Sequence, residues 1–296
     1  MIKNPIPWPN GARCAACITF DMDADSLIHL EHPKDGHRRV SAISMLRYGP
    51  EIGVPRILDT YRKLGIHQTF FIPAWCIEQY PQVVEAIVAG GHEVAHHGYL
   101  HENPQAGSRE EQRHWLQRGI EVIERHTGRR PRGWRAPLYN FSDDSADLLI
   151  EEGFLYDASL MGDDIPYLIS TAQGELVELP SHWGLDDWPQ FVHSMDLGYM
   201  MPVRDTASGL AAFRQEFEAA YAYGGLWIPV WHPFATGRLG RWHGVEAMLE
   251  EMLGRGDVWF ATLEEIAAHV RQCIDRGDYR PRVESLPQYP GPVSVS

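Results

Sequence analysis

The chain has 296 residues, of which 44% are hydrophobic and 11% aromatic, so it can form a sizeable core and is not an intrinsically disordered chain. Its 26 basic and 40 acidic residues give a formal net charge of −14, spread along the sequence, which argues against nucleic acid and anionic membrane surfaces as partners. The N-terminus has no apolar core typical of a signal peptide, and no run of eighteen apolar residues follows, so we expect a cytoplasmic protein.

Strand-like and helix-like segments alternate along the chain. The predicted strands are 15–20, 68–72, 93–95, 133–136, 155–157, 176–179, 226–231 and 258–262. The amphipathic segments predicted as helices are 55–64, 81–89, 109–126, 142–152, 208–223, 244–253 and 263–276. Mostly short connections favour a parallel sheet covered by helices, and about eight strands favour a closed or nearly closed β/α barrel of the α/β class. No linker or repeat divides the sequence, which predicts a single domain over 1–296.

Three segments fall outside this alternation. Residues 24–53 and 160–206 are predicted as long connections, the second interrupted only by the short strand near 176–179. Loops of this length in a compact domain are usually functional, and in a β/α barrel the loops that follow strands rim the active site. We therefore expect both segments to form walls or a lid. The proline-rich tail 281–296 is expected to pack loosely or to serve a subunit contact.

Polar residues with metal-binding side chains follow three of the predicted strands. Asp21 and Asp23 follow the first strand, His97 and His101 lie four residues apart after the third, and His232 ends a later one. In a barrel, all would meet at one mouth. Two imidazoles and a carboxylate are typical of catalytic zinc sites that leave a position open for water. The pattern indicates metal-assisted hydrolysis.

The spacing alone leaves the ligand register open. His92 and His96 also stand four residues apart, so they form a second pair with the same spacing. Asp25 continues the alternation of acidic residues after Asp21 and Asp23. The choice among these residues needs information beyond the spacing.

The sequence resembles the polysaccharide deacetylase family, also called NodB-like. The resemblance rests on five motifs in the family's order, from residue 19 to residue 232. They are Thr19-Phe20-Asp21-Met22-Asp23, His97-Gly98-Tyr99-Leu100-His101, Arg135-Ala136-Pro137, Tyr156-Asp157-Ala158-Ser159, and His232 at the end of a strand.

This resemblance implies a deformed β/α barrel with a divalent metal, zinc by default. Its implied ligands are Asp23, His97 and His101. The other implied roles are Asp21 as general base, His232 as general acid, Arg135 as the residue that orients Asp21, and Asp157 as support for the later catalytic groups.

Three departures from the family pattern point to a particular branch. The usual Asp-Asp-Gly is replaced by Asp21-Met22-Asp23, Gly98 stands where Ser or Thr is usual, and the last motif contains Trp231-His232-Pro233. Together with 177–180 and 183–187, these variants resemble an intracellular branch. That branch includes allantoinase-like and cyclic-imide-hydrolysing enzymes and a peptidoglycan deacetylase of similar layout.

The leading functional hypothesis is therefore a metal-dependent hydrolase that opens the ring of a small cyclic imide or ureide. The alternative is N-deacetylation of an amino sugar, a chitooligosaccharide or a peptidoglycan fragment with the same residues. A non-haem iron oxygenase could use two histidines and a carboxylate, but it usually has a jelly-roll fold, which the alternation of strands and helices disfavours. A non-catalytic binding module is disfavoured because Asp21 and His232 are both present. A small-molecule substrate and a homodimer or homotetramer are the expected partners.

Overall fold

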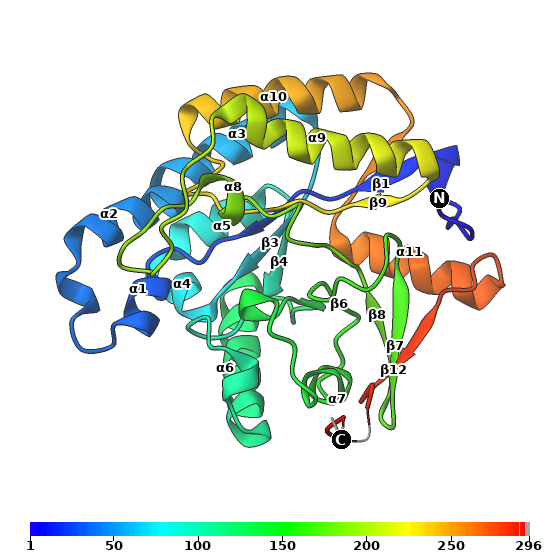
Figure 1. Ribbon diagram of the computed structural model, residues 1–296, viewed down its shortest axis with the longest axis horizontal. Helices are drawn as coiled ribbons and strands as arrows, with labels where there is room; N and C mark the ends of the chain where they lie inside the picture. Colours follow the sequence, from blue (N-terminus) through cyan, green and yellow to red (C-terminus); the bar gives the residue numbers. More distant parts are fainter. Residues whose placement is uncertain (290, 294–296) are drawn as a thin grey trace.

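The computed structural model describes residues 1–289 and 291–293, and it contains a mostly parallel sheet curved into a deformed barrel (Figure 1). Nine strands form one sheet in the order β10-β2-β3-β4-β5-β6-β8-β7-β12, and three form a second sheet in the order β11-β1-β9. Their bounds are β1 Cys14–Ala16, β2 Thr19–Asp21, β3 Thr69–Ile72, β4 Glu93–His96, β5 Gly133–Trp134, β6 Tyr156–Asp157, β7 Tyr167–Thr171, β8 Gly174–Glu178, β9 Leu226–Trp227, β10 Val230–Trp231, β11 Val258–Phe260 and β12 Val283–Ser285. The predicted α/β class and deformed barrel are confirmed.

Two predicted strands are each divided into two. The run 15–20 becomes β1 and β2, and the run 226–231 becomes β9 and β10. The two sheets remain continuous between these pieces, because the Cys17 and Thr19 amides donate to the carbonyls of Trp227 and Pro229, both at 3.0 Å. Pro229 has no amide hydrogen to donate, so regular pairing is interrupted beside it.

The barrel is closed by a short segment after β8 rather than by a full strand. Asp186 forms a parallel bridge with Val230 of β10. The Val230 amide donates to the Leu185 carbonyl and the Asp187 amide donates to the Val230 carbonyl, both at 3.0 Å. This closure brings 185–187 beside the carboxyl end of β10. This irregular closure of the barrel places Asp186 and Asp187 near the site.

Helices cover the outside of the barrel. In Figure 1, α9 and α10 lie side by side across one side of the sheet, with α6 and α7 on the opposite side. The α-helices are α1 Ser26–Glu31, α2 Val40–Tyr48, α3 Val54–Leu64, α4 Ala74–Gln79, α5 Pro81–Ala89, α6 Arg109–Thr127, α7 Ser145–Glu151, α8 Trp188–Phe191, α9 Thr206–Tyr223, α10 Leu239–Gly254 and α11 Leu263–Arg276. The starts of α6 and α11 are fixed by capping boxes, in which Ser108 pairs with Glu111 and Thr262 with Glu265.

Side chains of alternate strand residues pack either inside the barrel or between the barrel and the helices that cover it. Phe71 of β3 belongs to a fully buried cluster with Tyr156 and Val177 from neighbouring strands. The preceding residue, Phe70, belongs instead to the cluster that packs against α3, α9 and α10. Successive side chains of a strand point to opposite faces, so this adjacent pair joins two layers of core.

The segments predicted as irregular contain regular structure. Residues 24–53 include α1 and α2, and 160–206 include β7, which pairs antiparallel with β8, and the short α8. The tail does not pack loosely throughout, since β12 pairs parallel with β7. Residues 290 and 294–296 of that tail lie outside the described residues. These elements are short and lack a clear hydrophobic period, so the sequence pattern did not reveal them.

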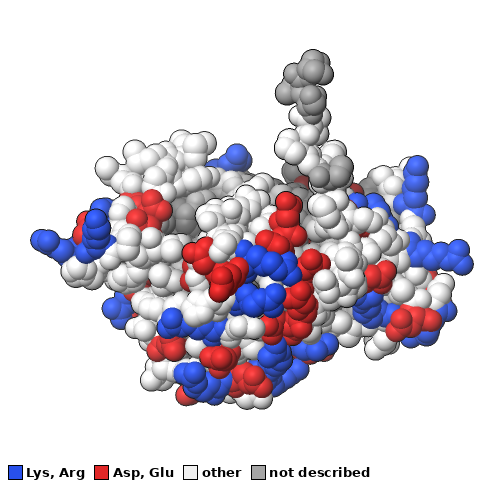
Figure 2. Space-filling view, turned by 90° about the horizontal axis from the view of Figure 1, so that it is seen from below, with Lys and Arg blue, Asp and Glu red and all other residues white. Residues whose placement is uncertain are grey.

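The surface carries interspersed charges of both signs on the face below α6 and α7 (Figure 2). Arg109 and Arg113 both pair with Glu151 there, and Arg130 pairs with Glu152. Such exposed pairs contribute roughly 0–1 kcal/mol each. No helix among residues 1–289 and 291–293 is long and apolar enough to cross a membrane.

Candidate metal and catalytic site

The carboxyl ends of the parallel strands deliver the polar residues to one place. Asp21 ends β2, and His97, Arg135 and His232 directly follow β4, β5 and β10. With Asp23 and His101, they line a cavity of ≈ 500 Å³. The structure therefore places these side chains together at one mouth of the barrel, as the sequence analysis expected. Asp157 is the exception, because it ends β6 but does not line the cavity.

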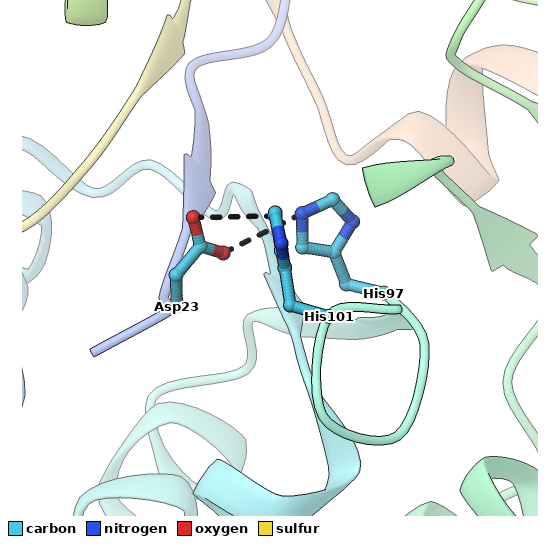
Figure 3. A group of neighbouring side chains, drawn as sticks. All are labelled: Asp23, His97 and His101. Carbon is cyan, nitrogen blue, oxygen red and sulfur yellow. Dashed lines mark ion pairs between the residues drawn. The ribbon is translucent and has the colours of Figure 1, made fainter. Parts of the chain in front are cut away.

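Asp23, His97 and His101 converge from two strands (Figure 3). All three are buried, and their candidate ligand atoms lie within 4.8 Å of one another. Asp23 Oδ1 is 3.4 Å from His97 Nε2, and Asp23 Oδ2 is 3.6 Å from His101 Nε2. Ligands placed about 2 Å from a tetrahedral metal are separated by roughly 3.3 Å, so these distances suit a shared cation. His92 and His96 are not part of this group.

The protonation chemistry of these residues also fits a divalent metal. His97 Nδ1 lies 2.8 Å from the Arg135 carbonyl oxygen, which can only accept, so Nδ1 carries the hydrogen and Nε2 presents a lone pair to Asp23. Burial lowers the pKa of His101 to about 4, against the attraction of Asp23, which favours the neutral imidazole that a metal requires. Asp23 Oδ1 is buried without a hydrogen-bond partner. A cation would satisfy that orphaned oxygen.

The ionisation of Asp23 points the same way. Burial works to raise its pKa, but the neighbouring His101, His232 and His97 outweigh burial and hold the pKa of Asp23 well below its usual range. The side chain is therefore an anionic carboxylate, which can serve as the oxygen ligand of a divalent cation. An N/O donor set of this kind is typical of zinc and other divalent transition metals.

A tight backbone turn carries His97 and His101 to the same side. Gly98 has φ +75°, and His101 itself has φ +71°. Glu102 holds the turn by accepting hydrogen bonds from the amides of Tyr99 and Leu100 at 2.9 and 2.8 Å. A β-carbon on Gly98 would also lie 3.0 Å from Glu102 Oε2. The departure at Gly98 therefore has a backbone reason, since a residue with a side chain would be strained there.

Arg135 fixes the second carboxylate of the site. Its Nη1 donates to Asp21 Oδ1 at 2.6 Å and to Thr19 Oγ1 at 2.9 Å, and its Nε donates to the Ala158 carbonyl at 3.0 Å. The guanidinium also lies over the Phe71 ring, 4.1 Å from its centre. The other oxygen of Asp21 is 3.6 Å from His97 Nε2. Arg135 thus orients Asp21 beside the candidate metal ligands.

His232 is held from behind by Asp187. Its Nδ1 lies 2.6 Å from Asp187 Oδ1, while Nε2 faces Asp23 Oδ2 at 3.4 Å. Burial works to lower the pKa of His232, but the charge and hydrogen bond of Asp187, helped by Asp23, raise it well above its ordinary value. The imidazole is therefore a protonated donor within the cavity, as a general acid must be.

Asp187 is a functional residue that the sequence analysis missed. It is fully buried and also accepts hydrogen bonds from the amides of His232 and Thr236, at 2.9 and 3.1 Å. The only signal was the acidic pair 186–187 in the segment that distinguishes the branch. Asp186, Asp187 and His232 form a second group of potential ligands, but the 2.6 Å contact between Asp187 and His232 is a hydrogen bond rather than the spacing of two metal ligands.

Asp157 acts on the site only through the backbone. Its two oxygens accept hydrogen bonds from the Ser159 amide and hydroxyl, at 3.0 and 2.6 Å. Ser159 Oγ in turn accepts a hydrogen bond from the Ala136 amide at 2.8 Å. Asp157 therefore positions the segment that contains Arg135. Asp157 does not line the cavity, and this placement is compatible with the supporting role that the resemblance implies for it.

Apart from Asp186, the remaining walls of the cavity are mostly aromatic and aliphatic. Leu27 comes from α1, and the longer segment 160–206 supplies most of the rest. These wall residues are Leu27, Leu138, Tyr139, Trp183, Trp188, Pro189, Leu197 and Tyr199. Both segments predicted as long connections thus contribute walls, as expected.

Two imidazoles and a carboxylate suited to a divalent metal, beside an oriented carboxylate and a protonated imidazole, define a hydrolase site at the mouth of a deformed β/α barrel. Comparison with known proteins identifies the class further. The model of the polysaccharide deacetylase family matches residues 41–156. The peptidoglycan deacetylase of Helicobacter pylori is 33% identical over 196 residues, which cover 58% of this chain and 67% of that protein.

Solved structures agree with this relationship. A presumed polysaccharide deacetylase from Mycobacterium smegmatis is 37% identical, with a TM-score of 0.90 over 98% of this chain and 99% of the other. The Puue allantoinase is 26% identical, with a TM-score of 0.78 over 90% of this chain and 94% of the other. The chain belongs to the polysaccharide deacetylase family and is a hydrolase of carbon–nitrogen bonds other than peptide bonds.

Proposed function

We propose that this protein hydrolyses a carbon–nitrogen bond in a small cyclic imide or ureide and thereby opens the ring. The observation that carries the proposal is the cavity: the polar groups meet in a space of ≈ 500 Å³ whose other walls are mostly aromatic and aliphatic. Small-molecule sites typically have volumes of about 300–1,000 Å³ and apolar walls with a few converging polar groups. A compact planar ring matches that description.

The walls favour a small substrate over a polymer. Leu27 of α1 and Leu197 and Tyr199 of 160–206 contribute to the same cavity as Leu138 and Trp183. A glycan chain would need a groove that continues past the reacting bond, whereas these side chains line one cavity together with the polar groups. The likeness to an allantoinase over nearly the whole chain adds support.

Asp23, His97 and His101 would hold the metal, and zinc suits their two nitrogens and carboxylate oxygens. A divalent cation at this position supplies Lewis-acid chemistry: it lowers the pKa of a water and polarises the scissile carbonyl. The orphaned oxygen of Asp23 and the tautomer of His97 are the features that suit it.

The chain's own residues then have separable roles. Asp21, held by Arg135 at 2.6 Å, takes a proton from the attacking water. His232, kept protonated by Asp187, delivers a proton to the leaving nitrogen, which an amide requires because its anion leaves poorly. Arg135, Asp187 and Asp157 are positioning residues.

N-deacetylation of an amino sugar is the second candidate. It would use the same groups on an acetamide, and the 33% identity to a peptidoglycan deacetylase favours it. The two reactions differ in their products, since deacetylation releases acetate and a free amine whereas ring opening releases neither.

The test is a panel of succinimide, a hydantoin, dihydrouracil and allantoin, with an N-acetylglucosamine oligomer and a peptidoglycan fragment in parallel. Purified protein is assayed with and without chelator, and Asp21→Asn serves as the matched inactive variant. We expect chelator-sensitive opening of at least one ring. Acetate release from the sugars with no ring opened would overturn the proposal in favour of deacetylation.

A further inference from the structure

One buried carboxylate in the cavity has no part in the chemistry described above. Asp186 is 2% exposed and lines the cavity with the residues of the site. Its Oδ1 accepts a hydrogen bond from the Trp188 amide at 2.7 Å, and its Oδ2 accepts one from the Tyr139 hydroxyl at 2.8 Å. No arginine, lysine or histidine of the described residues forms an ion pair with it. A carboxylate can accept about four hydrogen bonds, so Asp186 has acceptor capacity left.

Burial raises the pKa of Asp186 to about 7, in spite of the positive His232 nearby. A raised pKa in an ionisable side chain means that its anion is short of stabilising donors. A ligand that brings an N–H group into the cavity would supply one.

Asp186 is held in place by a strained segment. Leu138 and Tyr139 follow one another with φ +59° and +57°, a left-handed conformation that costs roughly 1–2 kcal/mol per residue when it is not glycine. Tyr139 is fixed by Asp186 and by an edge contact with Trp183 at 4.8 Å between ring centres. Backbone strain of this kind persists where the surroundings impose it, and it concentrates at ligand-binding sites.

The carboxyl of Asp186 also lies beside the proton donor. Candidate atoms of Asp186, Asp187 and His232 are within 4.8 Å of one another. If His232 protonates the leaving nitrogen, that nitrogen must lie close to His232 and therefore close to Asp186. In a cyclic imide the leaving nitrogen carries a hydrogen, and in a ureide the adjacent nitrogen does too.

We propose that Asp186, held by Tyr139, is a specificity-determining residue that accepts a hydrogen bond from the ring N–H of the substrate. The inference rests on the proposed function and names the substrate class within it: uncharged rings with a free N–H next to the scissile carbonyl. Rings alkylated on that nitrogen lose the hydrogen bond, and substrates with a carboxylate at this position meet the negative charge of Asp186.

The experiment compares succinimide with N-methylsuccinimide. The kcat/KM ratio of the two is measured for the wild type, Asp186→Asn, Asp186→Ala and Tyr139→Phe. Asn keeps an acceptor for the Trp188 amide, and Ala makes room for the methyl group. Tyr199→Phe is the matched control, since Tyr199 lines the same cavity but makes no hydrogen bond to Asp186.

We expect the preference for succinimide to fall about tenfold or more in both Asp186 variants, since a hydrogen bond to a charged group is lost. Tyr139→Phe is expected to lower it less, and Tyr199→Phe to leave the ratio unchanged. A second measurement gives the Kd by calorimetry in an Asp21→Asn background. There, Asp186→Asn weakens binding of succinimide about tenfold and leaves binding of N-methylsuccinimide unchanged.

The outcomes separate the two proposals. If the wild type opens succinimide and the Asp186 variants keep its full preference and affinity, the inference is overturned and the proposed function stands. If the wild type opens no ring of the panel, the proposed function is overturned, and this inference with it.

Discussion

Asp187 accepts two hydrogen bonds from His232, one from its ring Nδ1 at 2.6 Å and one from its backbone amide at 2.9 Å. One carboxylate thus fixes both the backbone position and the ring orientation of the proposed general acid. The ring orientation that results points Nε2 into the cavity.

The first prediction concerns this pair. Asp187→Asn is expected to lower kcat by about 100-fold or more, because an amide cannot stabilise the imidazolium and can favour the wrong tautomer. KM should change little, since Asp187 does not line the cavity. Steady-state kinetics over a pH series provide the measurement, and the alkaline limit of activity should move to lower pH.

The control is Thr236→Val, which removes one other hydrogen-bond donor to Asp187 and should lower kcat less. A wild-type kcat in Asp187→Asn would contradict the assignment.

The second prediction concerns metal content. His101→Ala should lose most of the bound divalent metal and the activity, because it removes one of three ligands and leaves Asp23 with fewer partners. Metal analysis of protein purified with added zinc measures this directly. The control is His182→Ala. The His182 side chain is 43% exposed, pairs with Glu216 and does not belong to the ligand set. Equal metal content in wild type and His101→Ala would show that the three residues do not form the site.

The sequence predicted the parts of the site that lie directly after strands. Asp21, Asp23 and His97 lie at or just after the ends of parallel strands, and the β/α pattern brings such ends together. Arg135 was indicated only by the resemblance to the family. Asp187 and Asp186 could not be placed in that way. Asp186 reaches the cavity and Asp187 reaches His232 because 185–187 closes the barrel against Val230. That contact joins segments more than 40 residues apart, and no local period encodes it.

Asp157 shows the opposite limitation. Its motif indicates a position near the site, and β6 does end there, but the side chain turns to Ser159 instead of the cavity. Strand position determines where a residue lies along the barrel, while local hydrogen bonding determines which way its side chain points. The short β7 and α8 were missed for a different reason, since they have only five and four residues. β7 is held in a hairpin with β8, and the start of α8 is held locally by Asp186.

The third prediction tests the pair formed by Asp157 and Glu178. Burial, with the charge of Asp157 beside it, raises the pKa of Glu178 well above its ordinary value, so this side chain is protonated and neutral. Glu178→Gln replaces a neutral donor by another of the same shape and should change the unfolding free energy by less than about 1 kcal/mol. Asp157→Asn leaves one acceptor oxygen for the two Ser159 donors. It should therefore destabilise more, by about 1–3 kcal/mol, and lower kcat through Arg135. Urea denaturation and kcat together measure this, and the reverse order of the two variants would contradict it.

The fourth prediction concerns the pH dependence of stability. His96 is fully buried, its Nε2 donates to the Leu116 carbonyl, and its Nδ1 accepts from the Gly98 amide, both at 3.1 Å, so only the neutral ring fits. Burial lowers its pKa to about 3 from an unperturbed value of 6.5. Between these values the unfolded chain binds a proton that the folded chain does not. The contribution to stability is therefore complete above pH ~6.5 and is lost as the pH falls toward 3.

Metal-free protein should accordingly lose about 2 kcal/mol of unfolding free energy through this residue between pH 7 and pH 5. His96→Gln offers a donor and an acceptor without a titrating ring, so it should be less stable at pH 7 but show a shallower decline toward pH 5. Urea denaturation of both proteins at the two pH values, in the presence of chelator, isolates the effect from metal release. The same decline in wild type and variant would mean that other groups, such as His92, whose pKa burial lowers to about 4, account for the acid sensitivity.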